Sequence, residues 1–491
     1  MKLLKLLTLM TTITVFSITS VNADYKFRHK FAGWDEPEAV QEINITTNSI
    51  NPVELSTAYS FILSADKTGG EWSWSGDIPT GLSLNSTTGE ISGTTTDSGG
   101  HSIDITVTKG SVNDTKSFSI LVKTGATEIK PADLEGSDFF GRGMSVSNGT
   151  ILSSSRGSDT EGAEAGAAYL FSVSTGEQIA KIVAEDFGSG ESGAGDQFGM
   201  MSKISNNYVI IGSPYNDDAG SNAGSAYIYT SNGSPSSKLL PGDLSANNYF
   251  GGAVAISDTY ALVGTYVNAV YVFNPSNGSQ LRKITGLAGS TAYFGTSMQI
   301  DGNLAILGDY LRNSSEGAAY IYNISTGTPV AELFADDFGG SEGSSNENFG
   351  RQVDISSNYV AIGAGLDNGQ GAVYIYDTAG TPLRKIVSND ISSGDEFGTY
   401  VSISGNYLAV GATGNGYGAA YVFNITTGSQ VLKVTPPVEY TSNIKFGMIV
   451  DIDNGLLVVS ADAPKNGSAG GAANAGTIFV YDISSGDQIT W

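Results

Sequence analysis

Residues 349–386 read FGRQVDISSNYVAIGAGLDNGQGAVYIYDTAGTPLRKI, and this stretch decides the fold. It contains four short runs rich in Val, Ile, Tyr and Ala, separated by residues that favour turns, such as Asn358 and Gly380. Apolar and polar residues tend to alternate within the runs, which is the period of a strand. The stretch therefore predicts a unit of four strands joined by turns.

The same unit returns along the chain. Its third strand recurs, for example as Ala226-Tyr-Ile-Tyr and Val373-Tyr-Ile-Tyr. Phe-Gly pairs open the unit seven times, 44 to 58 residues apart, at Phe140, Phe198, Phe250, Phe294, Phe349, Phe397 and Phe446. A strand-built repeat of this length is typical of a β-propeller blade. We predict an all-β protein with a seven-bladed β-propeller over 125–491, in which the third-strand rings pack between neighbouring sheets.

These motifs resemble FG-GAP repeats, the blades of the integrin α-subunit head and of many bacterial exported proteins. The resemblance rests on Phe-Gly before the first strand, on Gly212-Ser-Pro or Gly411-Ala at the end of the second, and on Gly-x-x-Tyr-Ile-Tyr in the third. It implies a propeller that binds a ligand on its long-loop face. Two repeats depart from the pattern, with Leu152-Ser-Ser and Val459-Ser-Ala where the second-strand glycine belongs.

Residues 41–124 show a different pattern of short alternating strands, which predicts a small immunoglobulin-like β-sandwich. The segment from Ile78 to Thr94 reads IPTGLSLNSTTGEISGT. It resembles a motif of the immunoglobulin-like, cadherin-like modules of bacterial surface proteins. The resemblance implies that this domain acts as a spacer or an adhesive stalk.

The first 23 residues have the pattern of a secretory signal peptide. Lys2 and Lys5 precede an apolar run, and Val21-Asn22-Ala23 forms a small-residue cleavage site. A short N-terminal arm, 24–40, follows. No later segment is apolar for long enough to span a membrane. We therefore predict a secreted or cell-surface protein with no membrane span after signal removal.

The composition restricts the partners. The chain has 24 Lys and Arg against 49 Asp and Glu, a net charge of −25. Such an acidic protein repels nucleic acid and anionic lipid, so we expect neither as a partner. An extracellular protein or a polysaccharide remains as the expected partner, and the sequence leaves the oligomeric state open. There is no cysteine, so core burial and strand pairing must stabilise the fold without disulfides.

The two ends of the repeat region are expected to meet. The segment Glu128–Ala132 aligns with a fourth strand such as the one at Lys181-Ile-Val, whereas the last repeat ends soon after its third strand. We predict that Glu128–Ala132 supplies the fourth strand of the last blade. This closure would remove an exposed sheet edge.

Strand order sorts the loops between two faces. The turns between strands 1–2 and 3–4 are tight and form a short-turn face, whereas the 2–3 and 4–1 loops are long and form the opposite, long-loop face. Binding residues are commonly carried by long loops on a rigid frame. Tyr215, Tyr266 and Tyr310 follow the second strand in three successive repeats, and they are expected on the long-loop face together with Asp217 and Asp218. These tyrosines are candidates for stacking on sugars or anchoring a protein; packing between neighbouring blades is the alternative.

Calcium is the obvious metal to consider in this family. The integrin-type loop Asp-x-(Asp/Asn)-x-Asp-Gly between strands 1 and 2 is missing from every repeat. Calcium would have to use acidic residues of the long loops, namely Asp186, Asp196, Asp336, Asp337 and Asp395. A solvated acidic surface explains these residues more simply, so we expect no cofactor and no metal site.

The sequence offers little chemistry for catalysis. The two histidines, His29 and His101, lie outside the propeller region, and no cysteine is present. The tryptophans expected of a quinone-dependent dehydrogenase propeller are missing, with only Trp491 in this region. We expect no enzyme but a recognition or adhesion protein. A structural component of an extracellular layer is the alternative, and a polymer hydrolase using a pair of carboxylates is a weaker one.

Overall fold

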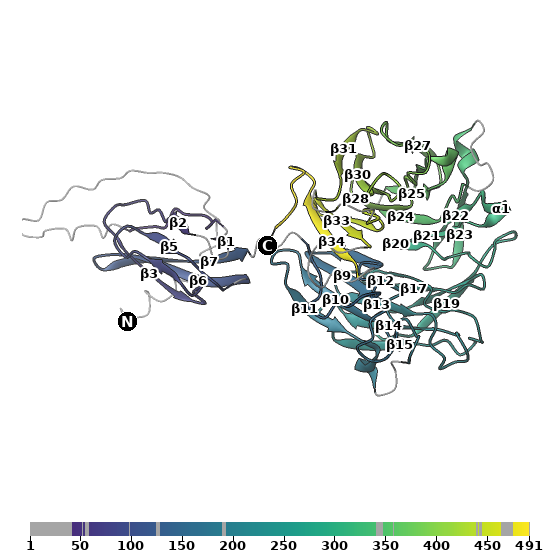
Figure 1. Cartoon of the computed structure of the whole chain (residues 1–491), viewed down its shortest axis with the longest axis horizontal. Helices are drawn as coiled ribbons and strands as arrows, with labels where there is room; N and C mark the ends of the chain where they lie inside the picture. Colours follow the sequence, from purple (N-terminus) through teal and green to yellow (C-terminus); the bar gives the residue numbers. More distant parts are fainter. Residues whose placement is uncertain are drawn as a thin grey trace, which may run out of the picture.

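The computed structural model describes residues 42–490 except 52, 55–57, 98, 124–127, 189–192, 340–346, 357, 438–439, 441–443 and 463–474. The predicted signal peptide, 1–23, and the N-terminal arm, 24–40, lie outside the described residues. The regular secondary structure of the described chain consists almost entirely of β-strands (Figure 1).

The first domain is a sandwich of two small sheets. One sheet has the order β1-β7-β6-β3 and the other the order β2-β5-β4. The strands are β1 (Val53–Glu54), β2 (Tyr59–Ile62), β3 (Glu71–Gly76), β4 (Leu82–Leu84), β5 (Glu90–Gly93), β6 (Gly99–Lys109) and β7 (Val112–Lys123). Ile91, Ile105 and Ile120 are completely buried in the core of this domain.

Two glycines explain the segment that resembles the bacterial surface modules. Gly81 has φ +91°, and a Cβ there would lie 2.1 Å from the carbonyl oxygen of Thr94. Gly93 has φ +141°, and its Cβ would lie 2.1 Å from the oxygen of Gly81. The two backbones thus cross without space for a side chain, so the motif needs glycine at both positions.

Seven sheets follow the sandwich, and we number them repeat sheets 1 to 7 in chain order. Sheet 1 consists of β8 (Gly143–Ser147), β9 (Thr150–Ser155), β10 (Ala167–Ser172) and β11 (Gln178–Ile182). Sheet 2 consists of β12 (Met201–Ile204), β13 (Tyr208–Ser213), β14 (Ser225–Thr230) and β15 (Pro235–Leu239). Sheet 3 consists of β16 (Ala253–Ile256), β17 (Ala261–Gly264), β18 (Ala269–Phe273) and β19 (Gln280–Thr285). Sheets 4 and 5 consist of β20 (Met298–Asp301), β21 (Leu304–Asp309), β22 (Ala318–Asn323) and β23 (Thr328–Leu333); and β24 (Gln352–Ser356), β25 (Tyr359–Ala364), β26 (Ala372–Asp377) and β27 (Pro382–Ile386). Sheets 6 and 7 consist of β28 (Tyr400–Ser404), β29 (Tyr407–Ala412), β30 (Ala419–Asn424) and β31 (Gln430–Val434); and β32 (Val450–Asp453), β33 (Leu456–Ala461) and β34 (Thr477–Asp482).

The strands of each repeat sheet pair antiparallel in chain order. Short helical segments occur only in the loops of the described chain: α1 (Arg312–Ser315), η1 (Ala184–Phe187), η2 (Ala335–Phe338) and η3 (Asp367–Gly369).

The third strands form the core between the sheets, as the sequence predicts. Tyr227, Tyr271 and Tyr374 are at most 1 % exposed. The phenylalanine of a Phe-Gly pair meets these rings edge-on; Phe250, for example, lies 5.5 Å from Tyr271 and 6.0 Å from Phe273 between ring centroids. Edge-to-face contacts of this kind stabilise aromatic cores beyond the area that they bury.

The Phe-Gly pairs also join each sheet to the one before it. The N–H of Gly199 donates to the carbonyl oxygen of Gly212 within sheet 2, at 3.0 Å. Gly212 in turn lies against sheet 3, where a Cβ would come within 2.0 Å of the oxygen of Gly251. The glycines of the second strand and of the Phe-Gly pair are thus required by the close approach of two backbones.

Neighbouring repeat sheets contact each other through their first strands, and β32 of sheet 7 contacts β8 of sheet 1. Figure 1 shows sheet 7, in yellow, beside the blue strands of sheet 1. The first Phe-Gly pair also joins these two sheets, since the N–H of Phe140 donates to the carbonyl oxygen of Ala475 at 2.9 Å.

The outer edge of sheet 7 differs from the prediction. Ile129 pairs with Ile478 through two backbone hydrogen bonds of 2.8 and 3.2 Å, but the rest of Glu128–Ala132 forms no strand. Gln488 pairs with Tyr481 further along β34, and the N–H of Ile489 donates to Val480 at 2.8 Å. Residues from both ends of the repeat region therefore share the fourth position, because the segment before sheet 1 turns away after one pairing.

Candidate functional site

The most distinctive feature of the long-loop face is a row of five tyrosines. Ring centroids are 5.6 Å apart between Tyr215 and Tyr249, 5.5 Å between Tyr249 and Tyr266, 6.1 Å between Tyr266 and Tyr293, and 5.4 Å between Tyr293 and Tyr310. We call this row the tyrosine arc. All five side chains are half-buried, and they belong to loops of repeat sheets 2, 3 and 4.

The arc is built by two repeated loop positions. Tyr215, Tyr266 and Tyr310 each follow a second strand, and the structure brings them together as the sequence predicts. They do not contact one another directly, because another tyrosine lies between each two of them. The intervening tyrosines, Tyr249 and Tyr293, directly precede the Phe-Gly pairs of sheets 3 and 4. These two tyrosines were not predicted from the sequence, although their place beside Phe250 and Phe294 would have identified the position.

The middle of the arc is tightly packed. Tyr266 lies against the backbone at Gly252, where a Cβ would come within 2.8 Å of the tyrosine ring. Burial, followed by the neighbouring tyrosines, raises the pKa of Tyr266 to about 12. The ring therefore stays neutral at any physiological pH and offers an apolar surface with a hydroxyl group.

Asp217 and Asp218 do not join the arc. Asp217 accepts the N–H of Asn222 at 2.7 Å within its own loop, and Asp218 forms an ion pair with Lys238 of the fourth strand β15. Both aspartates are exposed. Their carboxylates therefore serve the loop and the outer strand, and we find no geometric reason to place them in the same site as the tyrosines.

Two arginines, Arg156 and Arg351, lie near the arc, and a third, Arg142, lies beside Arg156. Arg142 and Arg156 are each 5.1 Å from the ring centroid of Phe139, the residue before the first Phe-Gly pair. Arg156 influences the pKa of Tyr266, and Arg351 influences that of Tyr310, so the two cations lie near different parts of the arc. None of these arginines was predicted from the sequence, because they are far apart in the chain.

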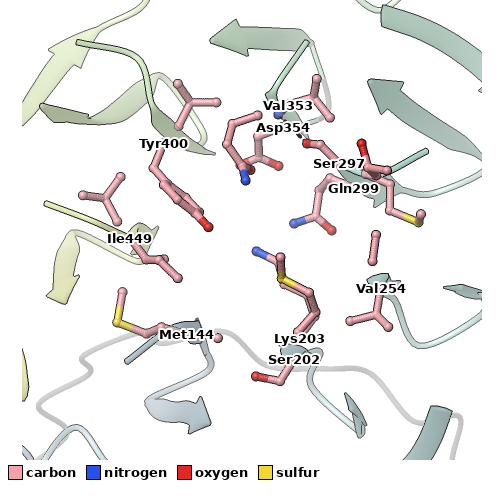
Figure 2. Close-up of a pocket in the computed structure, with 18 of the residues that line it drawn as sticks. Met144, Ser202, Lys203, Val254, Ser297, Gln299, Val353, Asp354, Tyr400 and Ile449 are labelled. Carbon is pink, nitrogen blue, oxygen red and sulfur yellow. Dashed lines mark hydrogen bonds between the residues drawn. The ribbon is translucent and has the colours of Figure 1, made fainter. Parts of the chain in front are cut away.

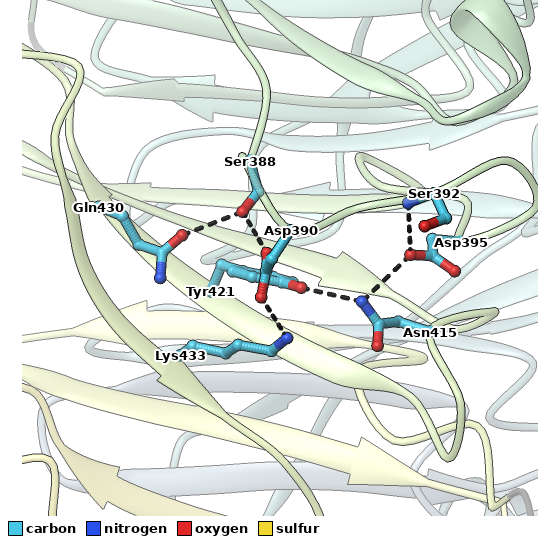
Figure 3. A network of polar contacts seen from close by, with 8 residues as sticks. All are labelled: Ser388, Asp390, Ser392, Asp395, Asn415, Tyr421, Gln430 and Lys433. Carbon is cyan, nitrogen blue, oxygen red and sulfur yellow. Dashed lines mark hydrogen bonds and ion pairs between the residues drawn. The ribbon is translucent and has the colours of Figure 1, made fainter.

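The acidic residues of the long loops are occupied by structural contacts. Figure 3 shows one such network, in which Asp390 accepts Ser388 at 2.6 Å and pairs with Lys433 at 2.5 Å. In the same loop, Asp395 accepts the backbone N–H of Ser392 at 2.8 Å and the amide of Asn415 at 3.2 Å.

The other aspartates considered for calcium behave similarly where they have partners. Asp196 accepts hydrogen bonds from the side-chain amide of Asn216 and the backbone N–H of Gly193. Asp337 accepts one from the N–H of Phe334, and Asp186 accepts one from the N–H of Val183. Within the described residues, no group of three or more His, Asp or Glu side chains is arranged to hold a metal ion. These carboxylates thus fix their own loops.

A narrow cavity of about 60 Å³ runs between the first strands and is lined by every repeat sheet. Figure 2 shows Lys203, Gln299 and Tyr400 with their polar ends turned toward its middle. Asp354 accepts the N–H of Ile355 at 2.8 Å and that of Ile403, in sheet 6, at 2.6 Å. Burial raises the pKa of Asp354 to about 7, and the nearby charge of Lys203 opposes this shift.

The carboxylate in the cavity therefore links two sheets. Asp451 acts in the same way, accepting the N–H of Val146 in sheet 1 at 2.8 Å and the hydroxyl of Ser402 in sheet 6 at 2.6 Å. Both side chains replace backbone hydrogen bonds that the splayed first strands cannot make to each other.

Comparison with known families agrees with this architecture. The family described as "FG-GAP repeat" matches residues 125–171, 177–229, 234–280, 330–376 and 381–423, and the family described as "Putative Ig domain" matches 42–123. The chain is thus an FG-GAP repeat protein with an immunoglobulin-like domain before the repeats. Domains of these two kinds are typical of extracellular adhesion and recognition proteins.

Other comparisons add little. No curated protein matches the chain. The crystal structure of the computationally designed Ika8 protein is similar with 16 % identity and a TM-score of 0.46, covering 74 % of this chain and 89 % of the designed one. A likeness at this level carries no functional argument. In the described part of the chain, no helix has the length and apolar character needed to cross a membrane.

Proposed function

We propose that this protein is an exported recognition protein that binds an extracellular protein or polysaccharide through its long-loop face, without covalent chemistry. The observation that carries the proposal is the tyrosine arc. Five half-buried rings in continuous contact across three sheets form a rigid surface of rings and hydroxyl groups. Tyrosine is enriched at recognition surfaces because it offers a large contact area at a low entropic cost.

The architecture in this proposal is one closed propeller of seven blades, with residues 42–123 as a spacer. Three facts support closure: β32 contacts β8, Ile129 pairs with Ile478, and Asp453 accepts the N–H of Asn148 at 2.9 Å. A closed ring holds the loops of sheets 2, 3 and 4 at fixed distances, which a binding surface needs.

Binding rather than catalysis is proposed because the buried carboxylates of the cavity have structural partners. Asp354 and Asp451 each accept backbone N–H groups from a neighbouring sheet. A carboxylate that holds two sheets together is a poor candidate for an acid or a nucleophile, since its oxygens are already bonded. The proposal invokes no metal and no cofactor.

The test is a glycan array combined with a pull-down from secreted material, using the variant Tyr249→Ala/Tyr293→Ala. These two rings connect the arc, so their loss should weaken binding by about tenfold or more. Tyr407→Ala is the control, because Tyr407 is 38 % exposed and begins β29 beside a tight turn of the opposite face. If both variants bind like the wild type, the tyrosine arc is not the binding surface.

A structural component of an extracellular layer is a second candidate, favoured by one observation. The fourth strands carry exposed aliphatic residues at equivalent β-bulges: Ile179, Leu281, Val330, Leu383 and Val431 are 44 to 49 % exposed. These side chains offer apolar contacts between copies at the outer edge. In the same pull-down, a layer protein would recover only itself, whereas a recognition protein would recover its partner.

A further inference from the structure

The basic residues of the repeat region are few, and most of them have a partner. Lys283 pairs with Asp243 at 2.7 Å, Lys385 with Asp367 at 2.7 Å, and Lys181 with Asp133 at 2.5 Å. Such pairing is expected where acidic residues outnumber basic ones by two to one. Any cation that remains unpaired in such a chain therefore requires an explanation.

Two arginines on the long-loop face are exceptions. Among the described residues, the guanidinium groups of Arg156 and Arg351 have neither a hydrogen bond nor an ion pair. Arg351 is exposed, and Arg156 is half-buried. Within the described repeat region, Lys203 is the other cation whose side chain has neither a hydrogen bond nor an ion pair, but it lies in the central cavity beside Asp354.

The surroundings of Arg156 hold an excess of positive charge. Arg142 is stacked on the same Phe139 ring and forms an ion pair with Asp462. Its Nη2 donates to the two carboxylate oxygens of Asp462 at 3.0 and 3.1 Å. Lys445 also pairs with Asp462, at 3.2 Å, so one carboxylate serves two cations. Burial and the neighbouring charge of Arg142 lower the pKa of Arg156, although Tyr215, Glu164 and Asp462 oppose this effect.

The two unpaired cations lie at different parts of the tyrosine arc. Arg156 follows β9 of sheet 1 and Tyr215 follows β13 of the neighbouring sheet 2, so the two residues have nearly equivalent loop positions. Arg351 follows Gly350, whose carbonyl oxygen would lie 2.0 Å from a Cβ at Gly308, two residues before Tyr310. In agreement with this arrangement, Arg156 affects the pKa of Tyr266 and Arg351 affects that of Tyr310. The arc therefore combines a row of aromatic rings with fixed positive charge near both ends. An arginine can hold a carboxylate or a sulfate with two parallel hydrogen bonds.

We propose that the long-loop face binds an acidic polysaccharide, whose sugar rings lie on the tyrosine arc and whose carboxylate or sulfate groups pair with Arg156 and Arg351. This inference rests on the proposed function and adds the class of ligand. The local cations are necessary because the protein as a whole, with a net charge of −25, repels an acidic polymer at long range.

Two features favour a saccharide over an acidic peptide. The arc repeats one kind of side chain at 5.4 to 6.1 Å, which suits a ligand made of similar rings. Protein partners are usually held by anchors buried in a pocket. The arc is instead a surface of half-exposed rings, and the cavity of about 60 Å³ between the first strands is too small for such an anchor.

Titration calorimetry on the full chain tests the proposal with paired probes. Polygalacturonate and its full methyl ester share a backbone and differ in charge, as do dextran sulfate and dextran; polyaspartate represents an acidic polypeptide. We expect tighter binding of the charged polysaccharide in at least one pair. Arg156→Gln/Arg351→Gln should weaken that binding by roughly tenfold or more and leave the neutral polymer unaffected. Arg384→Gln removes the same charge from β27, beside Thr426 of the opposite face, and should change nothing.

The outcomes separate this inference from the proposed function. If charged and neutral polymers bind equally, and only Tyr249→Ala/Tyr293→Ala weakens them, the arc binds sugars but the acidic ligand class is wrong. Tighter binding of polyaspartate through the same arginines would replace the polysaccharide by an acidic protein. If neither charged polysaccharide binds, the inference fails, while the array and the pull-down still decide whether the face binds anything.

Discussion

Asp354 shows how one buried side chain makes the assembly of sheets sensitive to pH. The residue is 6 % exposed, and its carboxyl group accepts hydrogen bonds from backbone N–H groups in sheets 5 and 6. Its pKa is raised to about 7, mainly by burial, whereas an aspartate in an unfolded chain has a pKa of about 3.9. Between these pH values the folded chain keeps a proton that the unfolded chain has released. Asp354 therefore stabilises the fold fully below about pH 4, and this contribution is lost as the pH rises through about 7.

We expect Asp354→Asn to reduce the loss of stability between pH 5 and pH 8. The asparagine cannot ionise, although one of its two acceptor oxygens is lost. The free energy of unfolding, measured with urea, should fall over this range by about 2–3 kcal/mol less in the variant than in the wild type. Asp336→Asn, at an exposed carboxyl group, is the control and should follow the wild type. A parallel pH dependence in wild type and Asp354→Asn would show that Asp354 does not titrate in this range.

Single residues also show what the sequence could and could not predict. The buried third-strand rings, such as Tyr227 and Tyr374, follow from a period of two residues that any strand imposes. Tyr249 and Tyr293 were missed because they lie in loops, where no period applies and only the neighbouring Phe-Gly pair fixes the position. The arginines near the arc could not be predicted, since Arg156 and Arg351 meet the same surface only through the arrangement of the sheets.

At the scale of the element, the second strand and the following Phe-Gly pair act as one joint between sheets. Gly212 of β13 lies so close to sheet 3 that a Cβ would be 2.0 Å from the oxygen of Gly251. In sheets 1 and 7, Ser154 and Ser460 take the place of the glycine, and their hydroxyl groups bond to Gly143 and Ile449. The two departures from the repeat pattern are therefore accommodated by local hydrogen bonds.

The substitution Gly212→Ala should destabilise the protein by about 1–3 kcal/mol, because the methyl group forces two backbones apart. The matched control is Gly242→Ala, where a Cβ would meet nothing within 4 Å. That change should be neutral or slightly stabilising, because alanine restricts the unfolded chain. Thermal unfolding of the two variants measures the difference, and equal melting temperatures would contradict a tight joint at Gly212.

At the scale of the whole molecule, the two ends of the repeat region decide whether seven sheets behave as a ring or as a row. The pairing of Gln488 with Tyr481 was not predicted, because a contact of so few residues leaves no periodic pattern in the sequence. Ile129 and Ile478 exchange two backbone hydrogen bonds, so their Cα atoms are expected about 5.5 Å apart, which suits a disulfide.

The chain has no cysteine, so the variant Ile129→Cys/Ile478→Cys can form a disulfide at this site alone. The bond would close a loop of most of the repeat region, and oxidation should stabilise the protein by up to about 5 kcal/mol relative to its own reduced form. The matched pair Ala420→Cys/Val434→Cys has the equivalent register between β30 and β31 but closes a short loop, for which about 3 kcal/mol is expected. Comparing each oxidised variant with its reduced form removes the cost of the substitutions themselves. If the first disulfide does not form in the folded protein, or if its oxidation leaves the melting temperature unchanged, the two ends do not meet in solution and the ring is open.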